Sequence, residues 1–383
     1  MLYKDFKGLK LSALGMGTVR LPITSENSAD LNVPAVHDIV DAAMAQGINY
    51  YDLGWDYHGC KAEPLVSQSL LRYPRESYYL ATKFPGYYPD KIDKVEQIFE
   101  QQLAHCGVEY FDFYLLHNVC ELNIKSYLDP KNGIMEYLLK QKEAGRIRYL
   151  GFSTHGGVDN IREFLDAVGE HMEFCQIQLN WLDWEFQNAR EKVGLLNERK
   201  IPVWVMEPLR GGKLLKLAEE DVNTLKALRP EETVYSWGLR FLQTVPGVTM
   251  VLSGLSSVEQ TLENVRTISE EKPLNQQEWN ALQSIAKGMI EKKVLPCTGC
   301  RYCVSHCPQE LNIPALLEMY NEQIFSGGGF IAPRAMLALP REKRSFACIG
   351  CRSCESFCPQ GIKISEAMAD FSAKTVEFLD SKR

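Results

Sequence analysis

The sequence lacks the features that usually mark membrane, secreted and nucleic-acid-binding proteins. No apolar run approaches the ~20 residues that cross a bilayer, and the first ten residues, MLYKDFKGLK, contain no apolar core of signal-peptide length. Cations are in the minority, because 42 Lys and Arg face 49 Asp and Glu, and the net charge of −7 argues against a phosphate-backbone partner. We therefore expect a cytoplasmic protein that binds neither nucleic acid nor a membrane.

Short β-rich runs alternate with amphipathic helical patterns over the first 285 residues, which is typical of repeated βα units and a parallel sheet. Eight runs can be read as strands, at residues 11–19, 48–53, 78–84, 111–117, 147–153, 174–180, 201–207 and 248–254. Eight such units suit a closed (β/α)8 barrel better than an open doubly wound sheet, for which a GxGxxG turn would follow an early strand. No such turn occurs there. We predict an α/β barrel, of the TIM type, over residues 1–285.

Eight of the twelve cysteines lie in two runs near the C-terminus with the spacing Cys-x2-Cys-x2-Cys-x3-Cys-Pro. The first run holds Cys297, Cys300, Cys303 and Cys307, and the second holds Cys348, Cys351, Cys354 and Cys358. A 4Fe–4S cluster needs four thiolates, and the short loops place three of them on one face. Zinc would be satisfied by two CxxC pairs, and disulfides are unusual in so large a chain. The spacing therefore predicts two 4Fe–4S clusters in a second domain, residues 286–383.

The two cysteine runs resemble those of two-cluster ferredoxins, in which the fourth cysteine of each run binds the other cluster. This resemblance implies that Cys358 binds the same cluster as the first three cysteines of the first run. Cys307 would bind the same cluster as the first three cysteines of the second run. The long helical insert between the runs is similar to that of α-helical ferredoxins attached to reductase subunits, so a small, mainly α-helical ferredoxin-like domain is expected. The basic stretch 340–344 is either a solvated loop or a dock for an acidic ferredoxin or flavodoxin-like electron carrier.

Polar residues close three of the predicted barrel strands, at the end where such barrels carry their chemistry. Asp52 lies at the end of the second strand and Tyr57 follows it, Lys83 lies at the end of the third and His117 ends the fourth. A tyrosine of pKa ~10 is a poor proton donor near neutrality unless its neighbours tune it. A neighbouring Lys83 ammonium would lower the pKa of Tyr57, and Asp52 would hold that ammonium in place. His117 would donate a hydrogen bond to the oxygen that receives the proton.

These four residues, in this order, strongly resemble the tetrad of the aldo-keto reductase superfamily, and the appended cysteine runs resemble its iron–sulfur branch. The resemblance extends through Gly151-Phe-Ser-Thr154 and Glu207-Pro-Leu-Arg-Gly-Gly212. It implies an oxidoreductase that moves hydride between NADP or NAD and a small carbonyl or alcohol substrate, with two 4Fe–4S clusters that serve electron transfer or are structural. It assigns to the cofactor Ser153, Thr154, Gln176, Met206, Ser253, Gly254, Gln260, Glu263 and Asn264. Because Gly254 and Gln260 replace the usual cations, the choice between NADP and NAD stays open, with Arg20 and Arg210 as possible substitutes.

Two other functions are compatible with the same residues. The chain could be an electron-transfer enzyme with a flavin or radical step, because NAD(P)H delivers two electrons as hydride whereas each cluster takes one; the sequence shows no flavin motif. The barrel could instead be a catalytically silent docking module, which the intact tetrad disfavours. Trp55, Cys60, Trp181 and Trp184 follow predicted strands and would line either an aromatic substrate cleft or the core.

Overall fold

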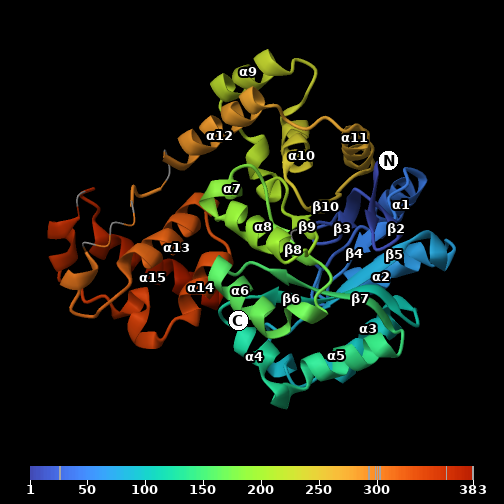
Figure 1. The fold of residues 1–383 in the computed structure, drawn as a ribbon, viewed down its shortest axis with the longest axis horizontal. Coiled ribbons are helices and arrows are strands. Elements are labelled where there is room, and N and C mark those ends of the chain that lie inside the picture. The colour runs from blue at the N-terminus through green and yellow to red at the C-terminus, as the bar shows by residue number, and fades with distance from the viewer. Residues whose placement is uncertain are drawn as a thin grey trace. The chain divides into compact units, whose positions relative to one another are not determined.

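Eight parallel strands close into a barrel in the first of two compact units, residues 1–283 and 284–383, into which the chain divides. The computed structural model describes residues 1–25, 27–291, 294–297, 299, 301, 303–358 and 360–381 (Figure 1). The barrel strands are β3 (Leu14–Gly17), β4 (Tyr50–Asp52), β5 (Tyr79–Phe84), β6 (Phe111–Val119), β7 (Ile147–Thr154), β8 (Cys175–Gln178), β9 (Val203–Met206) and β10 (Val248–Gly254). They follow one another around the barrel until β10 pairs with β3. The predicted barrel is confirmed, and each strand overlaps one predicted run.

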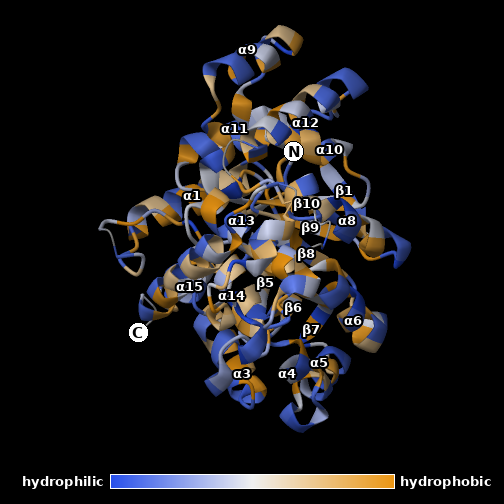
Figure 2. Cartoon of the chain, turned by 90° about the vertical axis from the view of Figure 1, so that its left-hand side faces the viewer, coloured by the Kyte–Doolittle hydropathy of each residue, from blue (hydrophilic) through white to orange (hydrophobic). Residues whose placement is uncertain are grey.

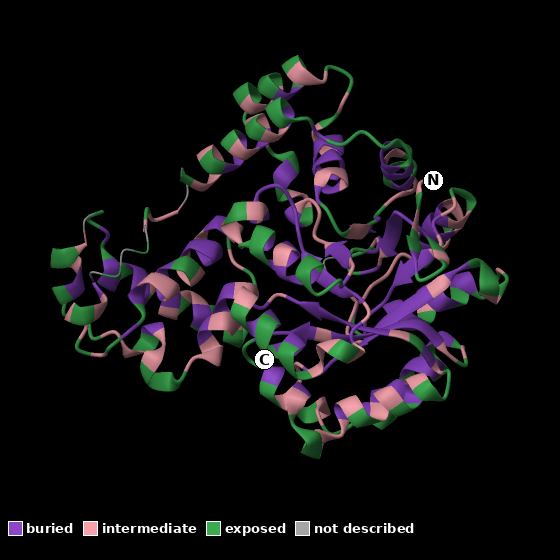
Figure 3. Ribbon diagram, viewed as in Figure 1, coloured by how far each residue is buried: buried purple, intermediate pink, exposed green. Residues whose placement is uncertain are grey.

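Helices surround the barrel (Figure 1). They are α1 (Val33–Ala45), α2 (Ala62–Leu70), α3 (Val95–Cys106), α4 (Ile124–Leu128), α5 (Ile134–Glu143), α6 (Val158–Val168), α7 (Asp183–Phe186), α8 (Ala189–Glu198), α9 (Glu219–Leu228), α10 (Val234–Thr244), α11 (Val258–Ser269) and α12 (Gln276–Glu291). The strands are buried along most of their length, whereas the helices expose their outer faces (Figure 3). Apolar and polar residues alternate along these helices accordingly, as the hydropathy colouring shows (Figure 2).

A β-hairpin that the sequence reading did not foresee precedes the barrel. Its strands β1 (Tyr3–Phe6) and β2 (Leu9–Ser12) are joined by Lys7 and Gly8, both with positive φ, as a two-residue hairpin turn requires. Phe6 packs edge-on against Trp204 at a ring separation of 5.1 Å. It belongs to the same buried cluster as the inward-facing residues at the N-terminal ends of the strands. The predicted run 11–19 therefore spans the end of this hairpin and β3.

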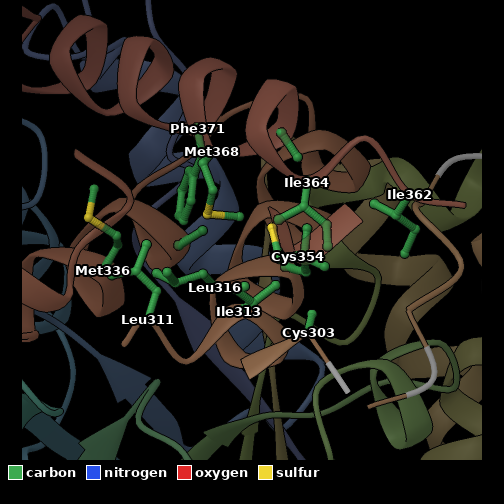
Figure 4. Close-up of a cluster of buried hydrophobic side chains, with 13 residues drawn as sticks. Cys303, Leu311, Ile313, Leu316, Met336, Cys354, Ile362, Ile364, Met368 and Phe371 are labelled. Carbon is green, nitrogen blue, oxygen red and sulfur yellow. The ribbon is translucent and has the colours of Figure 1, made fainter. Parts of the chain in front are cut away.

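The regular secondary structure of the second unit is helical, and its described residues contain no strand. Its helices are α13 (Ile313–Ser326), α14 (Ile331–Ala338) and α15 (Ile364–Asp380), with short 3-10 turns η6 (Val304–His306), η7 (Arg341–Lys343), η8 (Ser345–Ala347) and η9 (Ser353–Phe357). Their apolar side chains meet in one small core that also contains Cys303 and Cys354 (Figure 4). The predicted mainly helical domain is confirmed. Within the described ranges, no helix combines the length and the apolar character that a membrane span requires.

Candidate active site and cluster cavities

The four candidate catalytic residues lie together at the C-terminal ends of β4, β5 and β6. Lys83 Nζ donates a hydrogen bond to Asp52 Oδ2 at 2.6 Å and another to the carbonyl oxygen of Leu53. The same ammonium lies 5.0 Å from the centre of the Tyr57 ring. Tyr57 in turn meets His117 edge-on, with ring centres 5.8 Å apart. Strands that are neighbours in the barrel thus bring together side chains that are 65 positions apart in sequence.

Burial dominates the electrostatics of this group. Lys83 is fully buried and Asp52 is 2% exposed. Burial lowers the pKa of Lys83, but Asp52 and Tyr57 outweigh it and the pKa is raised overall. Burial raises the pKa of Asp52, and Lys83 offsets only part of that rise. The ammonium is therefore held firmly charged.

The pKa of Tyr57 corrects the expectation from sequence. Burial raises it to about 12, and the opposing effect of Lys83 is smaller. Lys83 acts in the expected direction, but the prediction of a lowered pKa was wrong, because sequence reasoning counted the charge and not the loss of water. Tyr57 consequently keeps its proton throughout the neutral range.

A second polar network, which the sequence reading missed, supports the strand that carries Lys83. Gln102 on α3 donates hydrogen bonds to the carbonyl oxygen of Lys83 at 3.1 Å and to Glu63 Oε1 at 2.7 Å. Thr82 also donates to Glu63, at 2.6 Å. Glu63, Thr82 and Gln102 are all fully buried. The signal for them was available, since Gln102 occupies a core-facing position one turn after Ile98 on a helix whose neighbouring core positions are apolar.

The loop that carries Tyr57 is anchored on both sides. Tyr88 donates a hydrogen bond to Asp56 Oδ2 at 3.0 Å. His58 Nε2 accepts one from the backbone N–H of Leu21 at 3.2 Å. Tyr87, beside Tyr88, packs edge-on against His117 with ring centres 4.9 Å apart. Sequence reasoning passed over Asp56, Tyr87 and Tyr88, although they lie beside the candidate catalytic residues.

Strained backbone gathers at this end of the barrel. His58 and Cys60 after β4, Asn118 in β6, and Glu207 and Arg210 after β9 all have φ between 49° and 66°. Non-glycine residues adopt such angles rarely, and they persist where the surrounding structure enforces them, often at functional sites. The strained residues therefore indicate the same end of the barrel for the functional site as the tetrad does.

Three of the residues predicted to bind the cofactor lie side by side on β7, β8 and β9. Ser153 is the register partner of Gln176, whose Nε2 lies 3.7 Å from Met206 Sδ. Ser153 Oγ accepts a hydrogen bond from the N–H of Asn118 at 2.8 Å. Thr154 donates its hydroxyl proton to the carbonyl oxygen of Val119 and accepts from the N–H of Gly156, so this hydroxyl serves the backbone.

The remaining predicted cofactor residues lie on β10 and α11. Asn264 donates a hydrogen bond to Ser253 Oγ at 2.8 Å, and Gln260 Oε1 accepts one from the N–H of Ser256 at 3.1 Å. Thr233 donates to Glu263 at 3.5 Å. Gly254 is exposed, and a Cβ placed on it would lie 3.1 Å from the Cβ of Arg20.

The two arginines considered as substitutes for the missing cations differ in their surroundings. Arg210 is 4% exposed, and its Nε donates to both carboxylate oxygens of Asp183 at 3.0 and 3.1 Å. Arg20 is exposed and extends from Gly254 to Gly211, where an added Cβ would lie 2.5 Å from its guanidinium. Of the two, Arg20 is the one beside Gly254.

The tryptophans divide between the core and the site. Trp181 is 1% exposed, and Trp184 packs edge-on against Phe241 and Trp279 at 5.8 and 5.6 Å. Trp184 therefore packs among the helices around the barrel, and Trp181 is buried. Trp55 is half-buried in the Tyr57 loop and stacks on His105 of α3 at 5.7 Å.

Two cavities lie among the cysteines of the second unit. The first is lined by cysteines of the first run and by Cys358, and the second is lined by the second triplet and by Cys307. The described cysteines of the first cavity are Cys297, Cys303 and Cys358, and those of the second are Cys307, Cys348, Cys351 and Cys354. Cys300 lies outside the described residues. No three His, Cys, Asp or Glu side chains within the described part converge as they would on a single ion.

The cysteines of both cavities are thiols in a confined space. None of the eleven described cysteines forms a disulfide. Burial, followed by the nearby Cys307, Glu355 and Cys303, raises the pKa of Cys354 to about 11. His306 and Phe357, which precede the fourth cysteine of each run, stack in parallel with ring centres 3.4 Å apart. The two runs therefore meet in a symmetric manner.

The basic stretch 340–344 is engaged locally. Lys343 donates to the carbonyl oxygens of Gln309 and Glu310, just after Cys307, and Arg344 donates to the last carbonyl oxygens of α14. This arrangement favours a structural role for the two residues over a docking role.

Comparison with known proteins agrees with this geometry. Residues 13–287 match the aldo/keto reductase family, and residues 296–362 match a 4Fe-4S dicluster domain. The chain belongs to the aldo/keto reductase family. It is an enzyme of the oxidoreductase type, with a 4Fe–4S domain attached to its barrel.

Relatives in this family align with about three quarters of the chain. The uncharacterized oxidoreductase YqkF of Bacillus subtilis is 28% identical over 309 residues, which cover 74% of this chain and 95% of that protein. L-galactose dehydrogenase of Arabidopsis thaliana is 26% identical over 287 residues, covering 69% and 86%.

Solved structures share the fold. The holo form of the aldo-keto reductase AKR11C1 from Bacillus halodurans superposes with a TM-score of 0.61 at 22% identity, covering 74% of this chain and 96% of that one. An aldo-keto reductase from Klebsiella pneumoniae in complex with NADPH superposes with a TM-score of 0.59 at 20% identity, covering 75% and 96%.

Proposed function

We propose that the barrel transfers hydride between a nicotinamide cofactor and a carbonyl or alcohol substrate, and that the second unit holds two 4Fe–4S clusters. The observation that carries the first half is the buried Lys83–Asp52 pair beside Tyr57. A tyrosine with a pKa of about 12 is protonated at neutral pH, as a proton donor to a carbonyl must be. We assign the first activity to residues 1–285 and the clusters to residues 286–383.

Each residue of the group has a separate task. Tyr57 gives its phenolic proton to the carbonyl oxygen, and the Lys83 ammonium stabilises the phenolate that remains. Asp52 holds that ammonium in place through the 2.6 Å hydrogen bond. His117 orients the substrate oxygen with a hydrogen bond. When bound, the reduced nicotinamide supplies the hydride to the carbonyl carbon, and alcohol oxidation reverses these steps.

The nicotinamide end of the cofactor fits the residues on β7, β8 and β9. Gln176 Oε1 is buried and accepts no hydrogen bond from the described residues, so it suits the N–H donors of a carboxamide. Ser153 lies opposite it, Thr154 follows, and Met206 offers a thioether to the ring face. Ser253, Gly254, Gln260, Glu263 and Asn264 would hold the adenosine half. The NADPH bound by the Klebsiella pneumoniae protein supports this class of cofactor.

We expect weak discrimination between NADPH and NADH, because Arg20 is a single exposed cation beside Gly254. Its contact with a 2′-phosphate would be screened by water and salt. Quenching of cofactor fluorescence should give dissociation constants that differ by less than about a hundredfold, or roughly 2.7 kcal/mol. Arg20→Ala should weaken NADPH binding and leave NADH binding unchanged. A preference beyond a hundredfold that survives Arg20→Ala would contradict this assignment.

The two cavities fit clusters bound in the crossed pattern. Cys297, Cys300, Cys303 and Cys358 would hold one, and Cys348, Cys351, Cys354 and Cys307 the other. Support comes from Cys307 and Cys358, each of which lines the cavity of the opposite triplet. When bound, the clusters exchange single electrons, which fits a ferredoxin or flavodoxin-like carrier as partner.

Protein purified without oxygen tests the whole proposal. Iron should approach about eight per chain, the content of two four-iron clusters. NADH or NADPH should be oxidised on addition of an active aldehyde or ketone. The cluster absorbance, followed in the same cuvette, shows whether electrons pass between nicotinamide and iron. Zinc in place of iron would contradict the clusters, and absence of any carbonyl-dependent oxidation across a broad panel would contradict the barrel activity.

A further inference from the structure

The two cysteine runs repeat one feature that cluster ligation by itself does not require. Arg301 and Arg352 occupy the same position in each run, directly after the second cysteine. Both have left-handed backbones, with φ of 65° and 61°, and a glycine that is also left-handed lies two residues before each of them. A glycine would adopt this conformation without strain. An arginine at the same strained position twice indicates that its side chain is used.

Each arginine lines the cavity of its own triplet. Arg301 lines the cavity with Cys297, Cys303 and Cys358, and Arg352 lines the other. Among the described residues that line each cavity, the arginine is the only charged side chain. The remaining walls are largely apolar, and Ile364 lines both cavities. Both arginines are exposed, so water screens part of their charge, and the apolar walls limit the screening on the cavity side.

A positive charge at this place acts on the reduction of a cluster. A 4Fe–4S core bound by four thiolates is already negative, and reduction adds one further negative charge. A nearby guanidinium therefore stabilises the reduced state more than the oxidised one. Net charge and exposure are among the properties by which a protein sets the potential of such clusters.

The two arginines are not equivalent. Arg352 Nη2 lies 3.4 Å from Glu366 Oε1, and both side chains are 63% exposed. Glu366 lies in the first turn of α15 and offsets part of the charge of Arg352. Arg301 forms no ion pair with any residue in the described ranges. Within the part of the chain that the structure describes, the charge of Arg301 is therefore less compensated than that of Arg352.

We propose that Arg301 and Arg352 raise the reduction potentials of the two clusters, each acting on the cluster of its own cavity, and that Glu366 weakens the effect of Arg352. This inference rests on the proposed clusters. It gives the two clusters different potentials although their ligands are the same. The cluster beside Arg301 is then the easier of the two to reduce.

The test measures the midpoint potential of each cluster by electron paramagnetic resonance during a redox titration of the full-length protein. Asn tolerates the left-handed conformation, so Arg301→Asn removes the charge with little strain, and Arg301→Lys keeps the charge. Arg301→Asn should make reduction of one cluster about tenfold less favourable, a fall of about 59 mV for one electron. Arg301→Lys should stay near the parent. Arg352→Asn should lower the other midpoint by a smaller amount.

Glu366→Gln provides a control that leaves the cavity walls untouched. It should raise the midpoint potential that Arg352→Asn lowers. This result tests the effect of charge on the cluster even if an arginine variant loses iron. Fully loaded variants whose midpoints match the parent would overturn this inference and leave the proposed clusters intact. A parent without about eight irons per chain would overturn both, and the iron analysis therefore separates the two failures.

Discussion

The barrel site and the cluster cavities assemble their functional side chains in opposite ways. In the barrel, Asp52, Lys83 and His117 come from separate strands whose register holds them in place, and a buried ion pair is already formed. In the second unit, short local loops supply the cysteines, and a small core surrounds two cavities. The packing of the barrel therefore stabilises its site without metal. The fold of the second unit should depend largely on metal, since metal binding and folding are coupled.

Removing the proton donor tests the prebuilt barrel site most severely. Tyr57→Phe should lower kcat by about 10²-fold or more, the scale of a lost general acid, and leave cofactor affinity nearly unchanged. Stopped-flow turnover of an active aldehyde or ketone measures it. Tyr137→Phe, on the distant helix α5, is a matched control that should keep parental activity. Equal kcat for Tyr57→Phe and the parent would remove Tyr57 from the mechanism.

The network behind Lys83 tests whether barrel packing supports the site. Gln102→Leu leaves the carbonyl oxygen of Lys83 and the carboxylate of Glu63 without this donor, which should destabilise the barrel by ~1–3 kcal/mol. Urea unfolding followed by tryptophan fluorescence measures this change. Gln276→Leu, at an exposed position of α12, should change the stability by much less. A stability equal to that of the parent would show that the network is dispensable.

Breaking one cluster tests the dependence of the second unit on metal. Cys358→Ser should reduce iron from about eight to about four per chain, because the affected cluster is the one held by the triplet some fifty residues earlier. Hydrogen exchange should increase in the second unit, while nicotinamide binding by the barrel persists. Cys60→Ser, outside both runs, should retain the parental iron. Loss of nicotinamide binding in Cys358→Ser would contradict the independence of the two units.

The smallest expected effect concerns pH. Because the pKa of Tyr57 is raised from 10 to about 12, its acid form is fully present below pH 10 and is lost only as the pH approaches 12. The kcat for carbonyl reduction should therefore change by no more than about twofold between pH 7 and 10. Alcohol oxidation needs the phenolate, so its rate should rise with pH over the same range. A fall in reduction rate centred near pH 8 would contradict the raised pKa.

Many residues of both sites could be predicted from the sequence, because they occur at strand ends or at a fixed spacing. The tetrad could be predicted because Asp52, Lys83 and His117 stand at the ends of parallel strands, which all meet at one end of a barrel. Fixed spacing signals the cysteines, since loops of two residues leave little freedom. The hairpin that carries Phe6 and the role of the buried Gln102 were not predicted. Each depends on contacts with residues that are distant in the sequence.

By itself, the sequence determined the barrel, the helical cysteine domain and the identities of the residues at the strand ends, because each follows from local periodicity or spacing. Only the tertiary structure decided how those residues behave. Burial moved the pKa of Tyr57 above its usual value, contrary to what the neighbouring Lys83 suggested. Packing committed Arg210 to Asp183 and left Arg20 beside Gly254. Solvent exclusion and pairing depend on distances between distant segments, and these exist only once the chain has folded.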